Sequence, residues 1–479
     1  MSITGALNSA MSGLRAAARG SELTSSNIAN ALTPGFGRRS LELSTLAIGS
    51  GGVRIDAVNR HSDAGLISDR RLADASSAHA QTTSDFFARL SNSIGTPDTA
   101  GSLSARLTAV ETSLMSAASR PDAPERLEQV VGDARALAQS FGTVSEQIQD
   151  SRTQADRDIA RDIDTLNTAL QQVKELNTQI RTRGFKGGSA AALIDERQRV
   201  VDQIGELVSV RTVPRDNGQI AIYSEGGAVL LDGSAARIEF AGANVVTPYQ
   251  TLADGTLSGI SINGFDVKTG ALGGGRIGAN FAVRDEHGVA AQAELDAMAR
   301  DLMTRFENPA LDPTTAPGDP GLFTDEGAAF DPAKEVGLAS RLALNAAIDP
   351  QAGGIVTRVR DGLGAATPGP VGDATLLNAF SAALSARDAP ASGSFAGASL
   401  SAFDLLSNIG GALSQQAARA DATLSFEVAR QSELAQLELA QGVDTDTELG
   451  NLLVLEQAYA ANARVIQAAD DMLDTLMRL

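Results

Sequence analysis

Three histidines are the most versatile acid–base and metal-binding side chains in this chain, and their positions argue against a metal centre. His61, His79 and His287 lie far apart, and none is followed by a second ligand at helical spacing. Glu286 and His287 reverse the order of a His-Glu-x-x-His zinc motif, in which two histidines one helical turn apart hold the ion. We therefore predict no metal site and an exposed turn at His287.

A glycine run at residues 273–278 has the G-x-G-x-x-G spacing that lets backbone amides approach a dinucleotide pyrophosphate. That motif requires a parallel strand–helix–strand unit, whereas the surrounding residues are typical of hairpins. We interpret the run as a glycine turn between strands. For the carboxylate pair Asp470-Asp471, beside an apolar helical stripe, we expect solvation or partner contact rather than general acid–base catalysis. No Ser, His and Asp set stands out and Cys is absent, so we expect neither an enzyme nor a cofactor.

Composition and charge limit the classes of partner. The 479 residues suggest roughly three domains. With aromatics at 4% and no Trp, the cores should be built from Ala, Leu, Ile and Val. A net charge of −19, without a basic cluster interleaved with aromatics, excludes a nucleic-acid surface. No apolar run is long enough to span a bilayer, and residues 1–30 lack the continuous apolar stretch of a signal peptide, so we predict neither membrane insertion nor a cleaved signal.

Both ends of the chain carry apolar or small residues in alternating steps of three and four, the spacing of a coiled-coil seam. The N-terminal seam comprises Ile3, Leu7, Ala10, Leu14, Ala17, Ser21, Thr24 and Ile28. The stronger C-terminal seam comprises Leu452, Leu455, Tyr459, Asn462, Ile466, Ala469, Leu473 and Leu476. Thr445 and Glu448 form a capping-box pattern just before it.

The two terminal helices are predicted to pack against each other, because each needs a partner for its apolar stripe. Charge supports this pairing: residues 1–40 hold four arginines against one acid, and residues 433–479 hold nine acids against two arginines. The alternative is that both are ordinary amphipathic helices of separate domains, and periodicity alone does not reject it.

Between the ends, the period of the apolar pattern changes twice. A third seam at residues 159–180 and a helix at 190–207 are followed at 208–283 by short runs rich in Val, Ile and Tyr, separated by Gly turns. Helix returns at 292–307, a proline-rich loop follows at 309–332, and 333–400 remain unassigned before helix at 401–441. The predicted fold is mainly α, elongated and multidomain, with an inserted β-rich module and coiled-coil-like domains formed by both termini.

The segment from Thr24 to Phe36 resembles the N-terminal signature of flagellar rod, hook and hook-associated proteins, the flagellar axial family. In that signature an amphipathic helix ends in Asn-Ile-Ala-Asn and breaks at a Thr-Pro-Gly-aromatic turn, here at Asn27, Asn30, Pro34, Gly35 and Phe36. The physics agrees, since Pro34 cannot continue a helix and Gly35 permits positive φ. Phe36-Gly37-Arg38-Arg39 stands where many relatives have Tyr-Ser-Arg-Gln, so the turn contacts should differ in detail.

Three further stretches are similar to hook-associated members of that family. They are residues 193–210 at the entry to the β module, residues 274–285 at its exit, and residues 451–476 in the closing helix. The resemblance implies a structural subunit that joins hook to filament by helical self-assembly. The alternatives are another axial protein (hook, rod or second junction protein) and, further away, a secreted adhesin or enzyme with axial-family ends.

The resemblance also implies a domain organisation. Residues 1–35 and 445–479 would form an inner tube domain that is disordered in the monomer, 36–207 and 286–444 a mainly helical core, and 208–285 an outer β-rich domain, with 309–400 a loop-rich part of undefined fold. The expected assembly interface consists of Ile3, Leu7, Leu14, Ile28, Leu452, Leu455, Tyr459, Ile466, Leu473 and Leu476.

Partners and location follow from the same resemblance. They are further copies of the chain, the hook protein, a second hook–filament junction protein and an export chaperone at the C-terminal helix. The expected location is the extracellular flagellum, reached by the flagellar type III route. The C-terminal stripe gives a reason for a chaperone, because an apolar stripe that is exposed before assembly promotes aggregation.

Overall fold

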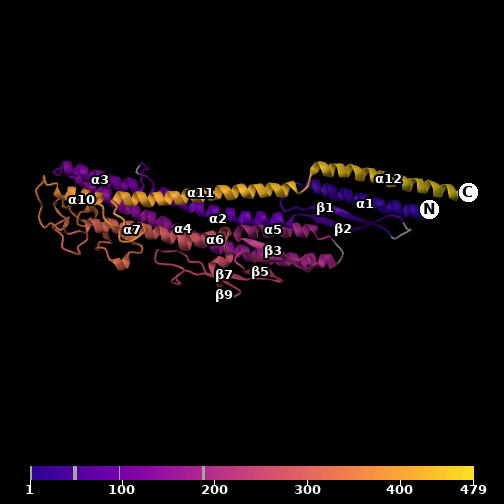
Figure 1. The fold of residues 1–479 in the computed structure, drawn as a ribbon, viewed down its shortest axis with the longest axis horizontal. Helices are drawn as coiled ribbons and strands as arrows, with labels where there is room; N and C mark the ends of the chain where they lie inside the picture. Colours follow the sequence, from indigo (N-terminus) through magenta and orange to yellow (C-terminus); the bar gives the residue numbers. More distant parts are fainter. Residues whose placement is uncertain (1–2, 47–50, 97, 186–188, 479) are drawn as a thin grey trace.

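The computed structural model describes residues 3–46, 51–96, 98–185 and 189–478, and it shows an elongated, mainly helical molecule (Figure 1). Its spine is α4 (Pro124–Phe185), a helix of 62 residues. Beside it run α2 (Ala64–Ile94) and α11 (Ala402–Ala440), which pack along each other. This confirms the predicted fold class: mainly helical, elongated, with small sheets attached to the rod.

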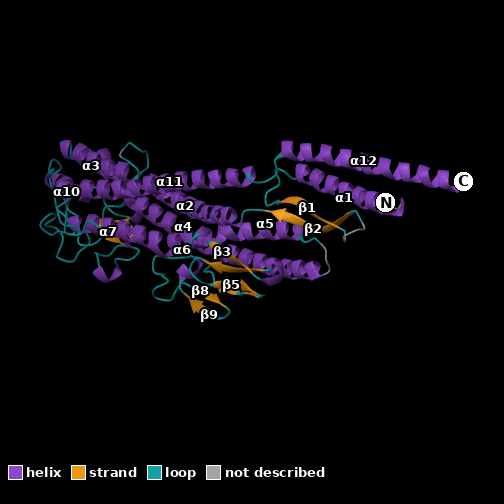
Figure 2. Ribbon diagram, turned by 45° about the vertical axis from the view of Figure 1, so that its right-hand side comes forward, coloured by secondary structure: helices purple, strands orange, loops and turns teal. Residues whose placement is uncertain are grey.

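Both termini lie at the same end of the rod, where α1 (Ile3–Ala29) and α12 (Thr445–Met477) pack side by side (Figures 1 and 2). A two-stranded antiparallel ribbon of β1 (Arg38–Thr45) and β2 (Val53–His61) extends along α1. The predicted pairing of the chain ends is therefore present in a single chain.

Two hydrophobic cores lie along α4, and this one helix contributes to both of them. The first core joins α4 to α2, α3 (Leu103–Ser119), α7 (Gly288–Phe306) and α10 (Thr375–Ser385). The second joins it to α5 (Ala191–Leu207), α6 (Gly275–Ala282) and the β module. Because α4 is a continuous helix, it couples the two cores mechanically.

The β module consists of two small antiparallel sheets. One has the order β3 (Val210–Pro214), β4 (Ile220–Ser224), β5 (Val229–Asp232) and β6 (Ser234–Ala235), and the other has the order β7 (Ile238–Phe240), β8 (Ile260–Ile262) and β9 (Phe265–Val267). Two side chains of α4 bind the two sheets. The Asn167 amide donates to the carbonyl oxygen of Ile238 and accepts from its N–H. The Asn177 amide makes the same two hydrogen bonds with the backbone of Ile220. Each side-chain amide thus makes the two backbone hydrogen bonds that a neighbouring strand would otherwise make.

The glycine run at 273–278 does not form the predicted turn between strands, because it opens helix α6. Gly274 and Gly275 have φ values of +73° and +58°. A Cβ at Gly275 would lie 2.5 Å from the carbonyl oxygen of Leu207, and one at Gly274 would lie 2.3 Å from Oγ of Ser209. Close approach of α6 to the end of α5, together with positive φ, explains the glycines.

The segment 309–400 is better defined than its sequence indicated. It contains β10 (Phe323–Asp325), β11 (Leu342–Leu344), α8 (Leu338–Arg341), α9 (Arg358–Asp361) and α10, joined by loops. Buried side chains from these short elements, among them Phe323 and Phe380, enter the first core. The segment is therefore part of the rod, although its elements are too short to show a period.

His287 is not the exposed turn residue that we predicted. It lies in the π-helical segment η3 (Val283–His287), which continues α6 directly into α7. Its ring is half-buried, with centroids 5.0 Å from Phe87 and 6.3 Å from Phe86. Burial lowers the pKa of His287, and the neighbouring His79 on α2 lowers it further.

These two histidines should make folding stability depend on pH. Burial lowers the pKa of both His79 and His287 below 6.5, so the unfolded chain binds more protons just below pH 6.5. Their contribution to the free energy of unfolding is therefore fully present above pH 6.5, and it is lost as the pH falls below that value. Burial raises the pKa of Asp296 to about 6, which acts in the opposite direction. Thermal unfolding at pH 7.5 and 5.5 should show a smaller acid-induced loss for His79→Gln with His287→Gln than for the parent, and equal losses would contradict this.

Candidate assembly site: the terminal helix pair and its polar junction

The terminal helices are antiparallel, and close contacts between them recur every seven residues along each helix. A Cβ at Gly13 would lie 2.8 Å from the Asn462 side chain, and one at Gly20 would lie 2.8 Å from Cδ2 of Leu455. One further step along, Nδ2 of Asn27 donates to Oε2 of Glu448 at 3.1 Å. The glycines let the backbones approach closely, and the seven-residue repeat is that of a coiled coil.

The structure distributes the ten expected interface residues unequally. Those that are half-buried in the helix pair or at its edge are Ile3, Leu7, Leu14, Ile28, Leu452, Leu455 and Ile466. Tyr459, Leu473 and Leu476 are exposed. On α1 several of the buried positions are small residues, including Ala10, Ala16 and Ala17. One copy of the chain therefore covers the seam only partly.

The helix α12 begins differently from the predicted capping box. Asp444, not Thr445, is the N-cap, and its carboxylate accepts from the backbone N–H groups of Asp446 and Thr447. Glu448 is buried and reaches Asn27 and Arg38 instead of the helix end. An aspartate caps as well as a threonine, and this arrangement frees Glu448 for contacts with the N-terminal segment.

A second apolar stripe on α12 lies beside the face that contacts α1. We call it the α12 stripe, and it comprises Val454, Ala461, Val465, Ala468, Met472 and Leu476. At 100° per residue these positions lie about a quarter turn from those that contact α1. All six are exposed, Val454 at 64% and Met472 at 52%. An exposed apolar stripe of this length indicates a surface for a partner.

The turn that follows α1 is fixed by its Asn residues. Nδ2 of Asn27 donates to the backbone oxygen of Arg39 at 2.8 Å, and the backbone N–H of Arg39 donates to Oδ1 of Asn27 at 3.0 Å. Nδ2 of Asn30 donates to the oxygen of Ser26 at 2.9 Å. Gly35 has a φ of +75°, and the Arg39 guanidinium lies 4.8 Å from the centroid of the Phe36 ring. Pro34 is exposed.

Beneath this turn lies a network of charges that we call the polar junction, formed by Arg38, Arg39, Arg60, Asp195 and Glu448. Asp195 on α5 accepts from Arg39 at 2.5 Å, from Arg60 at 2.6 Å and from the Gly37 backbone at 3.1 Å. Nε of Arg38 donates to Glu448 at 2.7 Å. Through Gln198, Arg60 is connected to Glu438 near the end of α11. The junction thus joins the terminal pair and the ribbon to the rod.

Sequence reasoning did not find this junction, and it assigned Glu448 to a capping box instead. Arg38 and Arg39 marked a departure from the family turn, and Asp195 lay in a stretch that resembled the entry to the β module. The signal was the unusual Arg-Arg pair after the turn, which requires acidic partners if it is buried. Only the fold places Asp195 and Glu448, which are far apart in the sequence, next to that pair.

Replacing Asp195 with Ala should loosen the ribbon of β1 and β2 from the rod. The change leaves Arg39 and Arg60 without their carboxylate, and lost hydrogen bonds to charged groups cost about 2–3 kcal/mol. Local opening should then rise roughly 30- to 150-fold. Tryptic cleavage after Arg39 and Arg60 in the folded protein measures this opening. Glu196→Ala, at the adjacent and more exposed position, is the matched control and should leave cleavage unchanged; equal rates in both variants would contradict a role for the junction.

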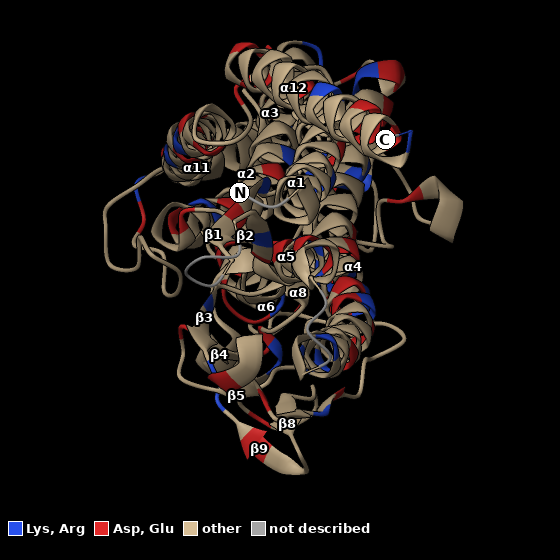
Figure 3. Ribbon diagram, turned by 90° about the vertical axis from the view of Figure 1, so that its right-hand side faces the viewer, with Lys and Arg blue, Asp and Glu red and all other residues tan. Residues whose placement is uncertain are grey.

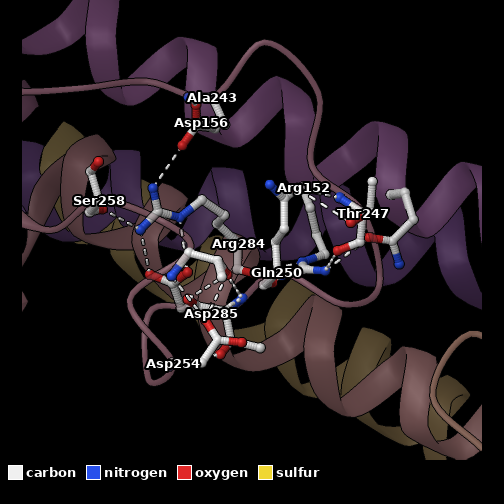
Figure 4. Close-up of polar contacts among 12 residues, drawn as sticks. Arg152, Asp156, Ala243, Thr247, Gln250, Asp254, Ser258, Arg284 and Asp285 are labelled. Carbon is white, nitrogen blue, oxygen red and sulfur yellow. Dashed lines mark hydrogen bonds and ion pairs between the residues drawn. The ribbon is translucent and has the colours of Figure 1, made fainter. Parts of the chain in front are cut away.

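A second buried charge network anchors the β module to the rod, and we call it the arginine cluster: Arg152, Asp156, Arg284 and Asp285 (Figure 4). Arg284 on η3 is fully buried and pairs with Asp156 of α4 at 2.6 Å and with Asp285 at 2.8 Å. It also donates to the Ser258 oxygen at 2.9 Å. The four charges balance, as buried ions require.

Arg152 completes the cluster by binding the long loop between β7 and β8. It donates to the backbone oxygens of Thr247 at 3.0 Å, Gln250 at 2.6 Å and Arg284 at 2.8 Å. The Ala243 backbone N–H donates to Asp156 at 2.6 Å. The cluster therefore holds a loop without regular secondary structure against α4 (Figure 4).

A cavity of about 480 Å³ between α2, α7 and α11 is lined by Phe87, Glu294 and Arg419 among others. Within the four described ranges, no three His, Asp or Glu residues are grouped as a metal site would require. None of the helices in these ranges is long and apolar enough to cross a membrane.

Fold and site together define a class of protein: a rod-shaped helical subunit whose paired termini present an uncovered apolar stripe for assembly. Three family models match the chain. The flagellar hook-associated protein FlgK helical domain matches residues 87–322, the flagellar basal body rod FlgEFG protein C-terminal model matches residues 440–479, and the flagella basal body rod protein model matches residues 7–36. The two shorter matches cover α12 and most of α1.

Curated relatives resemble the chain over most of its length. Flagellar hook-associated protein 1 of Escherichia coli (strain K12) is 28% identical over 551 aligned residues, covering 99% of each chain. The protein of the same name from Bacillus subtilis (strain 168) is 23% identical, covering 95% of this chain and 94% of its own. The solved flagellar hook junction protein FlgK from Burkholderia pseudomallei is 22% identical with a TM-score of 0.45, over 54% of this chain and 46% of that one.

The chain belongs to the flagellar hook-associated protein 1 family, and it is a structural protein of the hook–filament junction of the bacterial flagellum. Its relatives are named as structural flagellar proteins, not as enzymes.

Proposed function

We propose that the chain joins hook to filament by polymerising through its terminal helix pair, with the α12 stripe as the main contact between copies. The observation that carries the proposal is the uncovered stripe on a helix whose other apolar face is occupied by α1. In this arrangement the pair lies in the inner tube, and the β module, at the side of the rod away from α12, faces outward (Figure 3). The ten expected interface residues either hold α1 and α12 together within one copy or extend the contact between copies.

The remaining partners follow from the same proposal. One end of the junction polymer contacts the hook protein, and the other contacts a second junction protein. Before assembly, an export chaperone covers α12, because Val454, Met472 and Leu476 would otherwise be exposed to solvent. Export proceeds through the flagellar type III apparatus.

The function is tested by deleting the gene in the bacterium that produces this chain. We expect cells with hooks but without filaments, and filament subunits released unpolymerised into the medium. Expression of the intact chain should restore filaments. Normal filament growth in the deletion strain would contradict the proposed role.

We further propose that residues 1–35 and 445–479 are disordered in the monomer and become ordered on assembly. α12 buries only Glu448 and Ala469, too little apolar surface to hold a helix firmly. Amide hydrogen exchange on the soluble monomer should find α1 and α12 unprotected and α4 protected. Strong protection of α12 in the monomer would show that pairing with α1 is sufficient.

A further inference from the structure

The ribbon of β1 and β2 carries a second uncovered apolar surface near the terminal pair. Leu43 and Ile55 are cross-strand partners, and they are 49% and 39% exposed. Leu46, just beyond β1, is exposed to a similar degree. We call these three residues the ribbon patch. Two-stranded ribbons are marginally stable by themselves and gain stability when a further element covers a face.

The other side of the ribbon already has a partner. The Val53 backbone N–H donates to Oγ of Ser12 on α1 at 3.0 Å, and a Cβ at Gly52 would lie 2.6 Å from the same oxygen. The ribbon and α12 therefore contact different sides of α1 (Figure 3). Neither surface can cover the other within one copy, because α1 lies between them.

Charges around the two surfaces are complementary. The N-terminal segment through the ribbon, residues 3–46 and 51–61, holds six arginines against three acids. Arg15 makes no ion pair with any residue that the structure describes, whereas the arginines of the polar junction are already paired with Asp195 and Glu448. The helix α12 holds six acids against one arginine. Of these acids, Glu456, Asp470, Asp471 and Asp474 make no ion pair within the described part of the chain. A copy that approached the ribbon with its α12 would bring opposite charges together.

We propose that the ribbon patch is the docking surface for the α12 stripe of a second copy of this chain. Because stripe and patch are different surfaces, each contact leaves one free stripe and one free patch, so the contact repeats from copy to copy. A heterologous contact of this kind builds an open helical polymer or a ring, whereas two stripes facing each other would end at a dimer. The inference rests on the proposed assembly function and names the partner surface for α12.

Disulfide cross-linking tests the contact directly, because the chain has no native cysteine. Two single-cysteine variants, Ile55→Cys and Val465→Cys, are mixed, assembled and oxidised mildly. We expect a disulfide-linked species of twice the chain mass in the sedimented polymer and not in the soluble fraction. The matched control mixes Val465→Cys with Phe265→Cys, an exposed position on β9, and should give no such species.

A second variant tests the contribution of the patch to assembly. Leu43→Thr with Ile55→Thr places β-branched residues at both positions, which favours the ribbon, but removes most of the apolar area. We expect the critical concentration for assembly to rise at least tenfold, and Phe265→Thr to leave it unchanged.

The outcomes separate this inference from the proposed function. If polymer forms and the Ile55–Val465 pair cross-links no better than the control, the docking surface is wrong and the assembly function stands. If the cysteine-free chain forms no polymer in any condition that supports assembly of its partners, both proposals fail. Cross-linking of Val465→Cys to itself would place two stripes face to face and overturn the inference.

Discussion

Placing aspartates at both Val465 and Met472 is expected to abolish assembly while leaving the fold of the free chain unchanged. Both side chains are about half exposed on the α12 stripe, 45% and 52%, so neither contributes much to the core of the monomer. Exposed substitutions away from special features change stability little. In a polymer the same positions would be buried in every copy.

The size of the effect follows from burial. Losing a well-packed aliphatic side chain costs about 2 kcal/mol or more, and burying an unpaired charge adds to this. Two sites at about 2 kcal/mol each weaken every contact between copies roughly a thousandfold. Because the contact repeats along the polymer, such a loss should remove filaments altogether.

The measurement combines motility, electron microscopy of cells, and thermal unfolding of the soluble variant. The matched control is Ala460→Asp with Gln467→Asp, which adds the same charge on the polar side of α12. We expect filaments with the control and none with the stripe variant, at equal midpoints of unfolding. A stripe variant that unfolds early would show that the stripe belongs to the monomer core, and one that still supports filaments would contradict its role in assembly.

Replacing Asp156 with Ala is expected to destabilise the rod by about 3–5 kcal/mol, the range for breaking a buried ion pair by removing one partner. Asp156 and Arg284 are 1% and 0% exposed. The substitution leaves the Arg284 guanidinium buried with only Asp285 to balance it, while Arg152 remains charged nearby. It also frees the Ala243 backbone N–H.

Urea unfolding followed by circular dichroism measures this loss, and the loop between β7 and β8 should become sensitive to protease. Asp232→Ala is the matched control, because the Asp232–Arg215 pair also joins a carboxylate to an arginine but is about 40% exposed. Solvent screens such pairs, so the control should hardly shift the unfolding midpoint. Equal shifts in the two variants would mean that the arginine cluster is hydrated and does not anchor the module.

The terminal helices and the order of the main elements could be predicted because their signals are local. Apolar steps of three and four specify a helical stripe within a few turns, as at Leu452 and Leu455, and Pro34 with Gly35 ends a helix wherever it stands. The change of period near residue 208 marked the β module for the same reason. Pairing of the two ends was also expected, because each stripe lacked a partner, whereas the antiparallel orientation came from the structure.

Errors arose where two local readings were equally good. Asp444 and Thr445 can both cap a helix, and the choice depended on Glu448 finding Asn27 and Arg38. The glycines at 274 and 275 fit a turn or a helix start, and the close approach of Leu207 decided between them. His287 preceded a glycine and was interpreted as a turn, although packing on Phe87 keeps it helical.

By itself, the sequence determined that both ends and residues 159–180, 190–207, 292–307 and 401–441 are helical, that both ends carry apolar stripes, and that the chain resembles the flagellar axial family. Only the tertiary structure decided the register of α1 against α12, which side of α12 stays uncovered, and how Asp195 and the arginine cluster secure the ends and the β module. The physical reason is the distance along the chain over which each interaction acts. Periodicity and turn chemistry act over a few residues. Register and charge pairing depend on contacts such as that of Asn27 with Glu448, 421 residues apart in the chain.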